Sequence, residues 1–358
     1  MSATSDSPGS PKRVSILALP GMSSGTPING LFETLTLAEP ILNGGRPGGA
    51  AHFHVEIVGP EPGVFPGACG LPLQVHRAVG ECVRSDIVIA PSMFLSEEGW
   101  VKGRQPEAID WLRRQHEGGA DLCTACAGAL VLAETGLLDG RETTTHWAFA
   151  ETFRRNFPQV RLRLEELLVV DGARGEFVMS GAANSWQDLI LYIIARHVSP
   201  RAAQAVGKFL LFHWNTPSQV PFMPFSPETD HGDGIIRAVQ DHLHAGARLD
   251  LSVDELAEST GLARATFNRR FSRATGLAPI DYLQRLRVEK AKALLEETGR
   301  AIEDVGWQVG YEEPAAFRRI FRKVTRLTPG EYRRKFRLIR ADRPPRTGDA
   351  TAPEGHAP

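Results

Sequence analysis

A repeat near the carboxyl end constrains the fold of this chain more than any other feature. Residues 265–282 align with residues 315–332 at an offset of 50 positions, with eight of eighteen residues identical and a ninth an Asp/Glu pair. Upstream of each copy, residues 253–262 and 302–311 align at an offset of 49. Each copy shows helical spacing interrupted by a glycine, so we predict two helix-turn-helix units in an all-α segment.

Local signals define the helices of each copy. Gly261 and Gly310 precede the second helix in the two copies, where the turn needs a residue that tolerates positive φ. Ser252 and Glu255 have the spacing of a capping box at the start of the first helix. Phenylalanines four residues apart are expected to face one core in each copy: Phe267 with Phe271, and Phe317 with Phe321.

The opposite helix faces carry polar and basic side chains, which points to an anionic partner. Residues 262–340 hold 19 Lys and Arg against 9 Asp and Glu, whereas the rest of the chain holds 22 against 33. A basic end on an acidic body favours a nucleic acid as the partner of that end only. Arginine can bind guanine, and asparagine can bind adenine, through two hydrogen bonds each. We therefore predict that this segment binds double-stranded DNA.

Residues 233–338 resemble the AraC/XylS family, most clearly in RRIFRKVTRLTPGEYRRKF at the end of the second copy. The resemblance implies two recognition helices held by a central helix at about 279–298 and entering successive major-groove faces of DNA. It assigns base contacts to Ala265, Asn268, Arg269, Ala315, Arg318 and Arg319. Phosphate contacts are expected from Arg264, Arg273, Arg322 and Lys323.

The amino-terminal half shows the alternation of a doubly wound α/β domain. Apolar runs at 14–19, 55–58 and 86–92 alternate with helix-like stretches such as 106–119. Residues 120–126 then pass without a break into a helical stretch that ends at Gly140. A helix near 147–156, a strand pair near 163–181 and an apolar helix at about 184–197 follow. We predict a parallel sheet with helices on both faces.

Cys126 lies where the strand gives way to a helix, the arrangement of a nucleophile elbow. The helix start is expected to lower the pKa of its thiol. His146 follows twenty positions later and could form an acyl-transfer pair with the cysteine if the fold brings them together.

Residues 13–198 resemble the class I glutamine amidotransferase-like superfamily in its PfpI-like branch, which has a flavodoxin-like fold. The resemblance rests on CAGALVLAETGLLDGRETTTHW and SGAANSWQDLILYI. Fusion to an AraC-type module is the arrangement of GlxA-type regulators, whose first domain serves as a sensor and dimerises. It implies an effector pocket around Cys126, Ala127, Gly128, His146 and the loop with Gly21. Amino acids or quaternary amines are the effector classes that the resemblance favours.

Catalysis by this domain is not expected. Catalytic members of the branch place a glutamate after the first strand, and residues 19–30 contain no acidic residue. The alternatives are a cysteine-dependent hydrolase or amidase carrying a DNA-binding module, and a constitutive DNA-binding protein with an inert dimerisation domain. Cys123 and Cys126 spell C-x-x-C, but Cys123 should lie inside the strand, which disfavours a redox pair. No metal site and no cofactor are predicted.

These patterns divide the chain into five segments. We predict disordered tails at 1–12 and 339–358, a sensor domain at 13–198, a helical extension and proline-rich linker at 199–232, and the DNA-binding domain at 233–338. The start lacks a signal peptide and no apolar run could cross a bilayer, so we expect a cytoplasmic, DNA-associated protein. The four cysteines are too few and too clustered for a disulfide scaffold, so we expect reduced thiols. The expected function is transcriptional regulation, by activation through RNA polymerase, as a homodimer that responds to a small effector.

Overall fold

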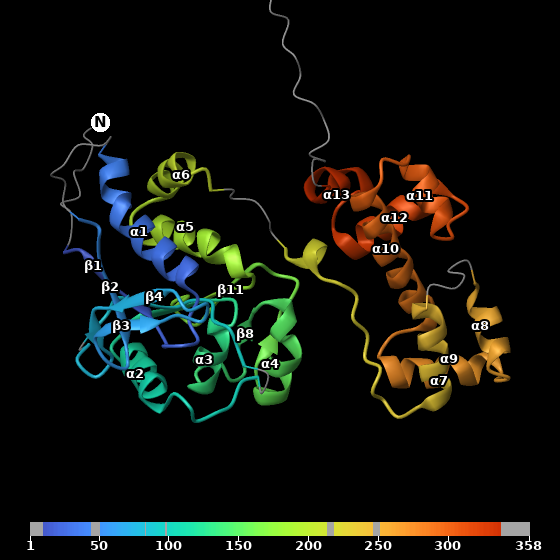
Figure 1. Ribbon diagram of the computed structural model, residues 1–358, viewed down its shortest axis with the longest axis horizontal. Coiled ribbons are helices and arrows are strands. Elements are labelled where there is room, and N and C mark those ends of the chain that lie inside the picture. Colours follow the sequence, from blue (N-terminus) through green and yellow to red (C-terminus); the bar gives the residue numbers. More distant parts are fainter. Residues whose placement is uncertain are drawn as a thin grey trace, which may run out of the picture. The chain divides into compact units, whose positions relative to one another are not determined.

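The computed structural model describes residues 10–43, 51–82, 84–96, 99–212, 218–245 and 251–337 (Figure 1). The chain divides into two compact units between Val220 and Pro221. Most of the two predicted tails, residues 1–9 and 339–358, lies outside the described residues. No helix in the described ranges combines the length and the apolar character needed to cross a membrane.

The first unit is built on a seven-stranded sheet in the order β10-β11-β7-β6-β1-β2-β5. All neighbouring pairs are parallel except β10 with β11. The central order β2-β1-β6-β7-β11 is that of a flavodoxin-like fold, as predicted. The strands are β1 (Lys12–Leu17), β2 (Phe53–Gly59), β5 (Arg77–Ala78), β6 (Ile87–Ala90), β7 (Asp121–Ala125), β10 (Leu168–Asp171) and β11 (Phe177–Ser180).

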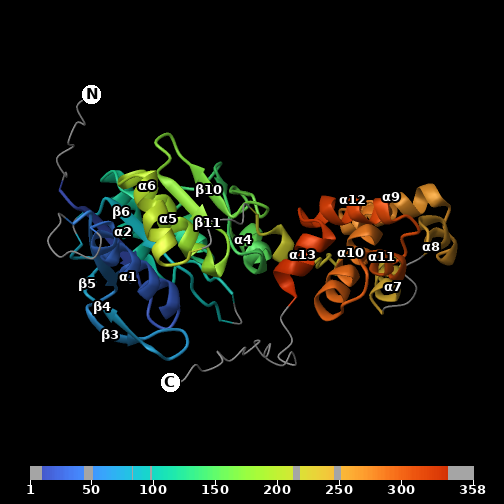
Figure 2. The same ribbon diagram turned by 90° about the horizontal axis from the view of Figure 1, so that it is seen from above.

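Helices cover both faces of this sheet, which confirms the doubly wound α/β prediction (Figures 1 and 2). One face packs against α1 (Gly25–Leu42), α5 (Trp186–His197) and α6 (Pro200–Phe209). The other packs against α2 (Pro106–Glu117), α3 (Gly128–Glu134) and α4 (Ala150–Asn156). Because both faces are covered, the central strands are buried along their length, and all residues of β6 and β7 are buried.

Short elements complete the first unit. The hairpin β3 (Gly63–Pro66) and β4 (Pro72–Val75) is antiparallel, and β8 (Glu142–Thr143) pairs in parallel with β9 (Arg161–Leu162). Single 3-10 turns occur at Trp147–Phe149 and Ala183–Ser185, and a third at Val220–Phe222 spans the boundary between the units. Helix α6 belongs to the first unit, because its Ala203 and Val206 are fully buried in that core.

The second unit is all helical in its described residues. Its helices are α7 (Gly234–His244), α8 (Val253–Ser259), α9 (Arg264–Thr275), α10 (Pro279–Glu297), α11 (Ile302–Gln308), α12 (Pro314–Thr325) and α13 (Pro329–Phe336). They form two separate hydrophobic cores. The long helix α10 contributes Tyr282 and Leu283 to the first core and Val288, Ala291 and Leu295 to the second.

The sequence repeat is also a repeat of contacts. Phe271 packs edge-on against Tyr282 with ring centroids 5.1 Å apart, and Phe321 packs on Tyr332 in the same way at 5.4 Å. All four predicted core phenylalanines are fully buried. Each copy therefore builds one core around the same aromatic pair.

The predicted turn and cap signals have the expected geometry. Gly261 and Gly310 adopt positive φ values of 69° and 90°. Ser252 and Glu255 form the predicted capping box at α8, and Thr328 with Glu331 forms a second one at α13. These devices fix the two helix-turn-helix units locally.

Candidate DNA-binding surface and ligand site

The second helix of each helix-turn-helix unit, α9 or α12, presents most of the predicted DNA-contacting side chains to solvent. In α9 the exposed residues are Ala265, Arg269 and Arg273, and Arg264 at its first position is exposed as well. In α12 they are Ala315, Arg318, Arg319, Arg322 and Lys323. Because the phenylalanines of both helices point into the cores, the basic side chains lie on the outward faces. These basic side chains can therefore contact a polyanion without any rearrangement of the helices.

Two of these arginines have an acidic partner within their own helix-turn-helix unit. Arg264 pairs with Asp254 of α8 at 2.6 Å, and Arg318 pairs with Glu303 of α11. In both units the acidic residue comes from the first helix and the arginine from the second. Lys323 lies 3.9 Å from Asp281. These pairs are exposed and compete with phosphate for the same cations.

Asn268 is less accessible than the resemblance implies. Its side chain is half-buried, and its Oδ1 atom is buried without a hydrogen-bond partner among the described residues. The neighbouring Arg270 donates two hydrogen bonds to Asp233, at 2.8 and 2.9 Å, and so ties α9 to the start of α7. Arg269 is thus the more accessible candidate for base contact in α9.

In the first unit, the chain turns sharply at the carboxyl end of β7. Cys126 adopts a positive φ of 55°, which is unusual for a residue with a side chain, and α3 begins two residues later. Gly128 is required here, because a Cβ atom at this position would lie 1.9 Å from the carbonyl oxygen of Ala90. The predicted elbow is therefore present.

The thiol in this elbow does not have the predicted acidity. Burial raises the pKa of Cys126 to about 11, although the Ala127 N–H and the Ser92 hydroxyl both favour the thiolate. Only 4% of Cys126 is exposed, and Ala127 is fully buried. The prediction of a lowered pKa was wrong because the loss of hydration outweighs the stabilisation provided by the start of a seven-residue helix.

His146 is held by its own backbone neighbourhood. Its Nδ1 accepts a hydrogen bond from the Ala148 N–H at 3.1 Å, and its ring packs on Trp147 with centroids 4.9 Å apart. Burial lowers the pKa of this imidazole. In the described residues, no hydrogen bond joins His146 to Cys126.

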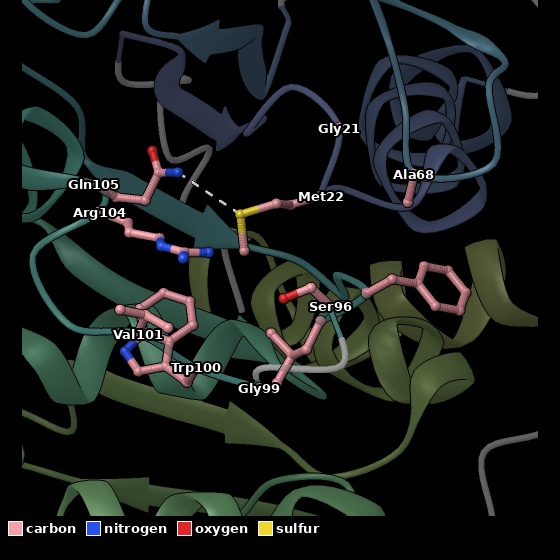
Figure 3. Close-up of a pocket in the computed structure, with 11 residues that line it drawn as sticks. Gly21, Met22, Ala68, Ser96, Gly99, Trp100, Val101, Arg104 and Gln105 are labelled. Carbon is pink, nitrogen blue, oxygen red and sulfur yellow. Dashed lines mark hydrogen bonds between the residues drawn. The ribbon is translucent and has the colours of Figure 1, made fainter.

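A cavity of about 300 Å³ lies beside the loop that follows β1 (Figure 3). Its lining includes Gly21 but not Cys126, Ala127, Gly128 or His146. Met22 and Trp100 provide apolar wall, and Gln105 donates to the Met22 sulfur at 3.7 Å. The Trp100 indole donates to Glu134 of α3 at 2.7 Å, which fixes one side of the cavity. The described residues that line it are Gly21, Met22, Ala68, Phe94, Leu95, Ser96, Gly99, Trp100, Val101, Arg104 and Gln105.

The segment after β6 connects the elbow to this cavity. Ser92 contacts the Cys126 thiol, whereas Phe94, Leu95 and Ser96 line the cavity. Sequence reasoning did not identify Ser92 or the other polar residues around the elbow. Thr145 donates to the Cys126 carbonyl at 2.8 Å, and the Gln219 amide donates to the Thr145 carbonyl at 2.9 Å. The run of three threonines before His146 could have indicated that Thr145 lies near the elbow. No local sequence pattern indicated a role for Gln219.

Metal binding has no structural support in the described ranges, where no group of three His, Cys, Asp or Glu side chains is placed to hold an ion. The four cysteines are unpaired thiols, of which only Cys69 is exposed. Cys123 lies inside β7 and Cys126 in the turn after it, the separation that disfavoured a redox pair.

Comparison with known proteins assigns both units. Residues 256–335 match the helix-turn-helix domain family, and residues 32–195 match the DJ-1/PfpI family. The chain is a DNA-binding transcriptional regulator with a helix-turn-helix domain and a DJ-1/PfpI domain. The helix-turn-helix match covers both α9 and α12, the two helices that carry the exposed basic side chains.

Two curated transcriptional regulators align with most of this chain. The HTH-type transcriptional regulator CdhR of Pseudomonas aeruginosa is 29% identical over 253 residues, which cover 70% of this chain and 73% of CdhR. The HTH-type transcriptional regulator GlxA of Rhizobium meliloti is 26% identical over 241 residues, covering 64% and 72% of the two chains. A crystal structure of a putative transcriptional regulator from Vibrio parahaemolyticus aligns with 56% of this chain and 99% of its own, at 24% identity and a TM-score of 0.48.

Proposed function

We propose that this regulator responds to a small molecule that binds in the cavity beside Gly21, and that it activates transcription as a homodimer. The cavity carries the proposal. Its volume of about 300 Å³ suits a small metabolite, and its walls combine the apolar Met22 and Trp100 with the polar Arg104 and Gln105. The elbow of Cys126, Ala127 and Gly128 contacts Ser92, two residues before the cavity-lining Phe94, and His146 follows Thr145, which donates to the Cys126 carbonyl.

The chemistry of the Cys126 elbow in the described residues supports a sensing role for the first unit. A thiol with a pKa of about 11 is almost entirely protonated at neutral pH, and a protonated thiol is a poor nucleophile. No imidazole is hydrogen-bonded to it in the described residues, and the loop after β1 supplies no carboxylate. We therefore propose that the DJ-1/PfpI domain binds its effector without turning it over.

Filling the cavity tests where the effector binds. Metabolites, including amino acids and quaternary amines, are first screened for a shift of the thermal unfolding temperature of the full chain. A bound effector at 100 times its Kd stabilises the protein by about 2.7 kcal/mol. Ala68→Trp places a large ring in the cavity and should abolish the shift, whereas Ala51→Trp, at an exposed position outside it, should preserve the shift. A full shift in Ala68→Trp would place the effector elsewhere.

The assembly and its action need separate tests. Sedimentation of the full chain at micromolar concentration should give a dimer, and a monomer would reject that part of the proposal. A reporter gene is placed behind a promoter that carries an operator selected from random DNA with the full chain. Its expression should rise when the effector is added. A fall would identify a repressor instead. Cytoplasmic and nucleoid-associated localisation follows from the same function and can be imaged with a fluorescent fusion.

A further inference from the structure

The segment that joins the two units is anchored on both sides of the boundary. On the first unit, the Gln219 side chain is 1% exposed and donates to the Thr145 carbonyl at 2.9 Å. It fills space that exists only because residue 181 is glycine, since a Cβ atom on Gly181 would lie 2.6 Å from the Gln219 amide nitrogen. Thr145 in turn donates to Cys126, so Gln219 is two contacts from the elbow.

On the second unit, the same segment contacts both helix-turn-helix cores. Phe222 packs edge-on against Phe336 of α13, with ring centroids 4.9 Å apart, and Phe336 packs on the second helix-turn-helix core. Phe225 packs edge-on against Tyr282 at 5.1 Å and belongs to the first core. The segment therefore contacts both helix-turn-helix cores, which α10 also connects.

Hydrogen bonds to the backbone hold the segment between and beyond these rings. The ammonium of Lys292, which is 7% exposed, donates to the Met223 carbonyl at 2.7 Å. Gln240 of α7 donates to the Glu228 carbonyl at 2.9 Å, and Arg237 donates to the Thr229 carbonyl at 2.8 Å. Proline-rich chain has little conformational freedom to lose, so few contacts suffice to hold it. Residues 221–229 are thus part of the DNA-binding unit.

We propose that residues 219–229 form a strap that couples the Cys126 elbow to the relative placement of the two recognition helices. Only Val220 and Pro221 separate Gln219, anchored in the first unit, from Phe222, anchored in the second. The two helix-turn-helix cores are separate, so their relative placement depends on α10 and on the strap. A change at the elbow that displaces Gln219 would also displace Phe222. The relative placement of α9 and α12 would then change, and with it the affinity for one operator.

The first test distinguishes the relative placement of the two helix-turn-helix units from DNA binding by each unit alone. An operator is selected from random DNA with the full chain, and a second version has one half-site scrambled. Phe222→Ala and Phe225→Ala should each lower affinity for the intact operator at least about fivefold and leave affinity for the single half-site unchanged. The double variant should be no weaker than the weaker single variant, because both release one strap. Phe209→Ala, an exposed phenylalanine of α6, is the matched control.

The inference rests on the DNA-binding function, and the single half-site reports on that function separately. Loss of all binding by the wild-type chain would reject the function itself. If Phe222→Ala binds the intact operator as well as wild type, the strap does not place the halves. If the variant loses affinity by the same factor on both DNAs, the Phe222 ring only stabilises the helical fold, and the proposal is overturned.

The second test examines the coupling to the elbow. Gln219→Ala, and Gln219→Glu, which replaces the amide donor by an acceptor facing the Thr145 carbonyl, should each change affinity for the intact operator by at least about threefold in the wild-type background. The change should disappear in the Phe222→Ala background, where the strap is already released. Gln159→Ala, at an exposed position of the first unit, is the control. No change in either background, or the same change in both, would contradict coupling through the strap.

Discussion

Gly128 passes so close to Ala90 that a side chain on residue 128 would overlap the carbonyl oxygen at the end of β6. The first turn of α3 therefore packs directly on the neighbouring strand. Since the atom it would meet is backbone, it cannot rotate away as a side chain could. The contact fixes the elbow against the sheet and determines which residue can occupy position 128.

Gly128→Ala should lower the free energy of unfolding of the first unit by about 3 kcal/mol, at the upper end of the usual cost of overpacking. Urea unfolding followed by tryptophan fluorescence measures the change. Gly80→Ala is the control, because a Cβ atom there meets nothing within 4 Å and its φ is ordinary. Equal stability of the two variants would mean that α3 can shift away from β6.

The reactivity of Cys126 should rise with pH well beyond neutrality. At pH 7 a thiol with a pKa of about 11 is ionised in roughly one molecule in ten thousand. In a Cys69→Ser variant, which removes the exposed thiol, we expect negligible alkylation of Cys126 by iodoacetamide at pH 7 and a continuing increase towards pH 10. Mass spectrometry of the Cys126 peptide measures the rate. A rate that levels off below pH 8 would show a low-pKa thiolate and revive the enzyme hypothesis.

The repeat made the second unit predictable, because its signals are local. Helical spacing, a glycine at each turn and the Ser252 capping box specify each helix within about ten residues, and Gly261 and Gly310 adopt the positive φ that the turn requires. The elbow was predictable for the same reason, since β7 and α3 are adjacent in sequence.

The environment of the elbow was not predictable, because distant segments create it. The pKa of Cys126 depends on how deeply the sheet and helices bury it, and the cavity is lined by three separate stretches around residues 21, 68 and 94–105. Gln219 reaches Thr145 from more than seventy residues away. No spacing rule within one helix or strand contains such information.

Arg319 should contribute mainly to sequence discrimination. It is exposed on the outward face of α12 and has no ion-pair partner within the described residues, so its guanidinium is available for a base edge. Arg319→Ala should weaken binding to the selected operator about tenfold more than binding to random DNA, within the roughly 1–3 kcal/mol of a good base contact. Fluorescence anisotropy titrations on both DNAs measure this difference. Arg154→Ala in α4 of the first unit should affect neither, and equal losses on the two DNAs would assign Arg319 to phosphate contact.

Glu303 should oppose DNA binding whatever the sequence. Its carboxylate pairs with Arg318 on the recognition helix and also places a negative charge beside the phosphate backbone. Glu303→Gln should therefore raise affinity for operator and random DNA alike by a few-fold. It should also steepen the slope of log affinity against log salt by about one unit, because one more cation becomes available to release a counterion. Glu107→Gln makes the same charge change in the first unit and should leave the slope unaltered. If both variants changed the slope equally, the effect would come from net charge, and the Glu303–Arg318 pair would have no influence of its own on DNA binding.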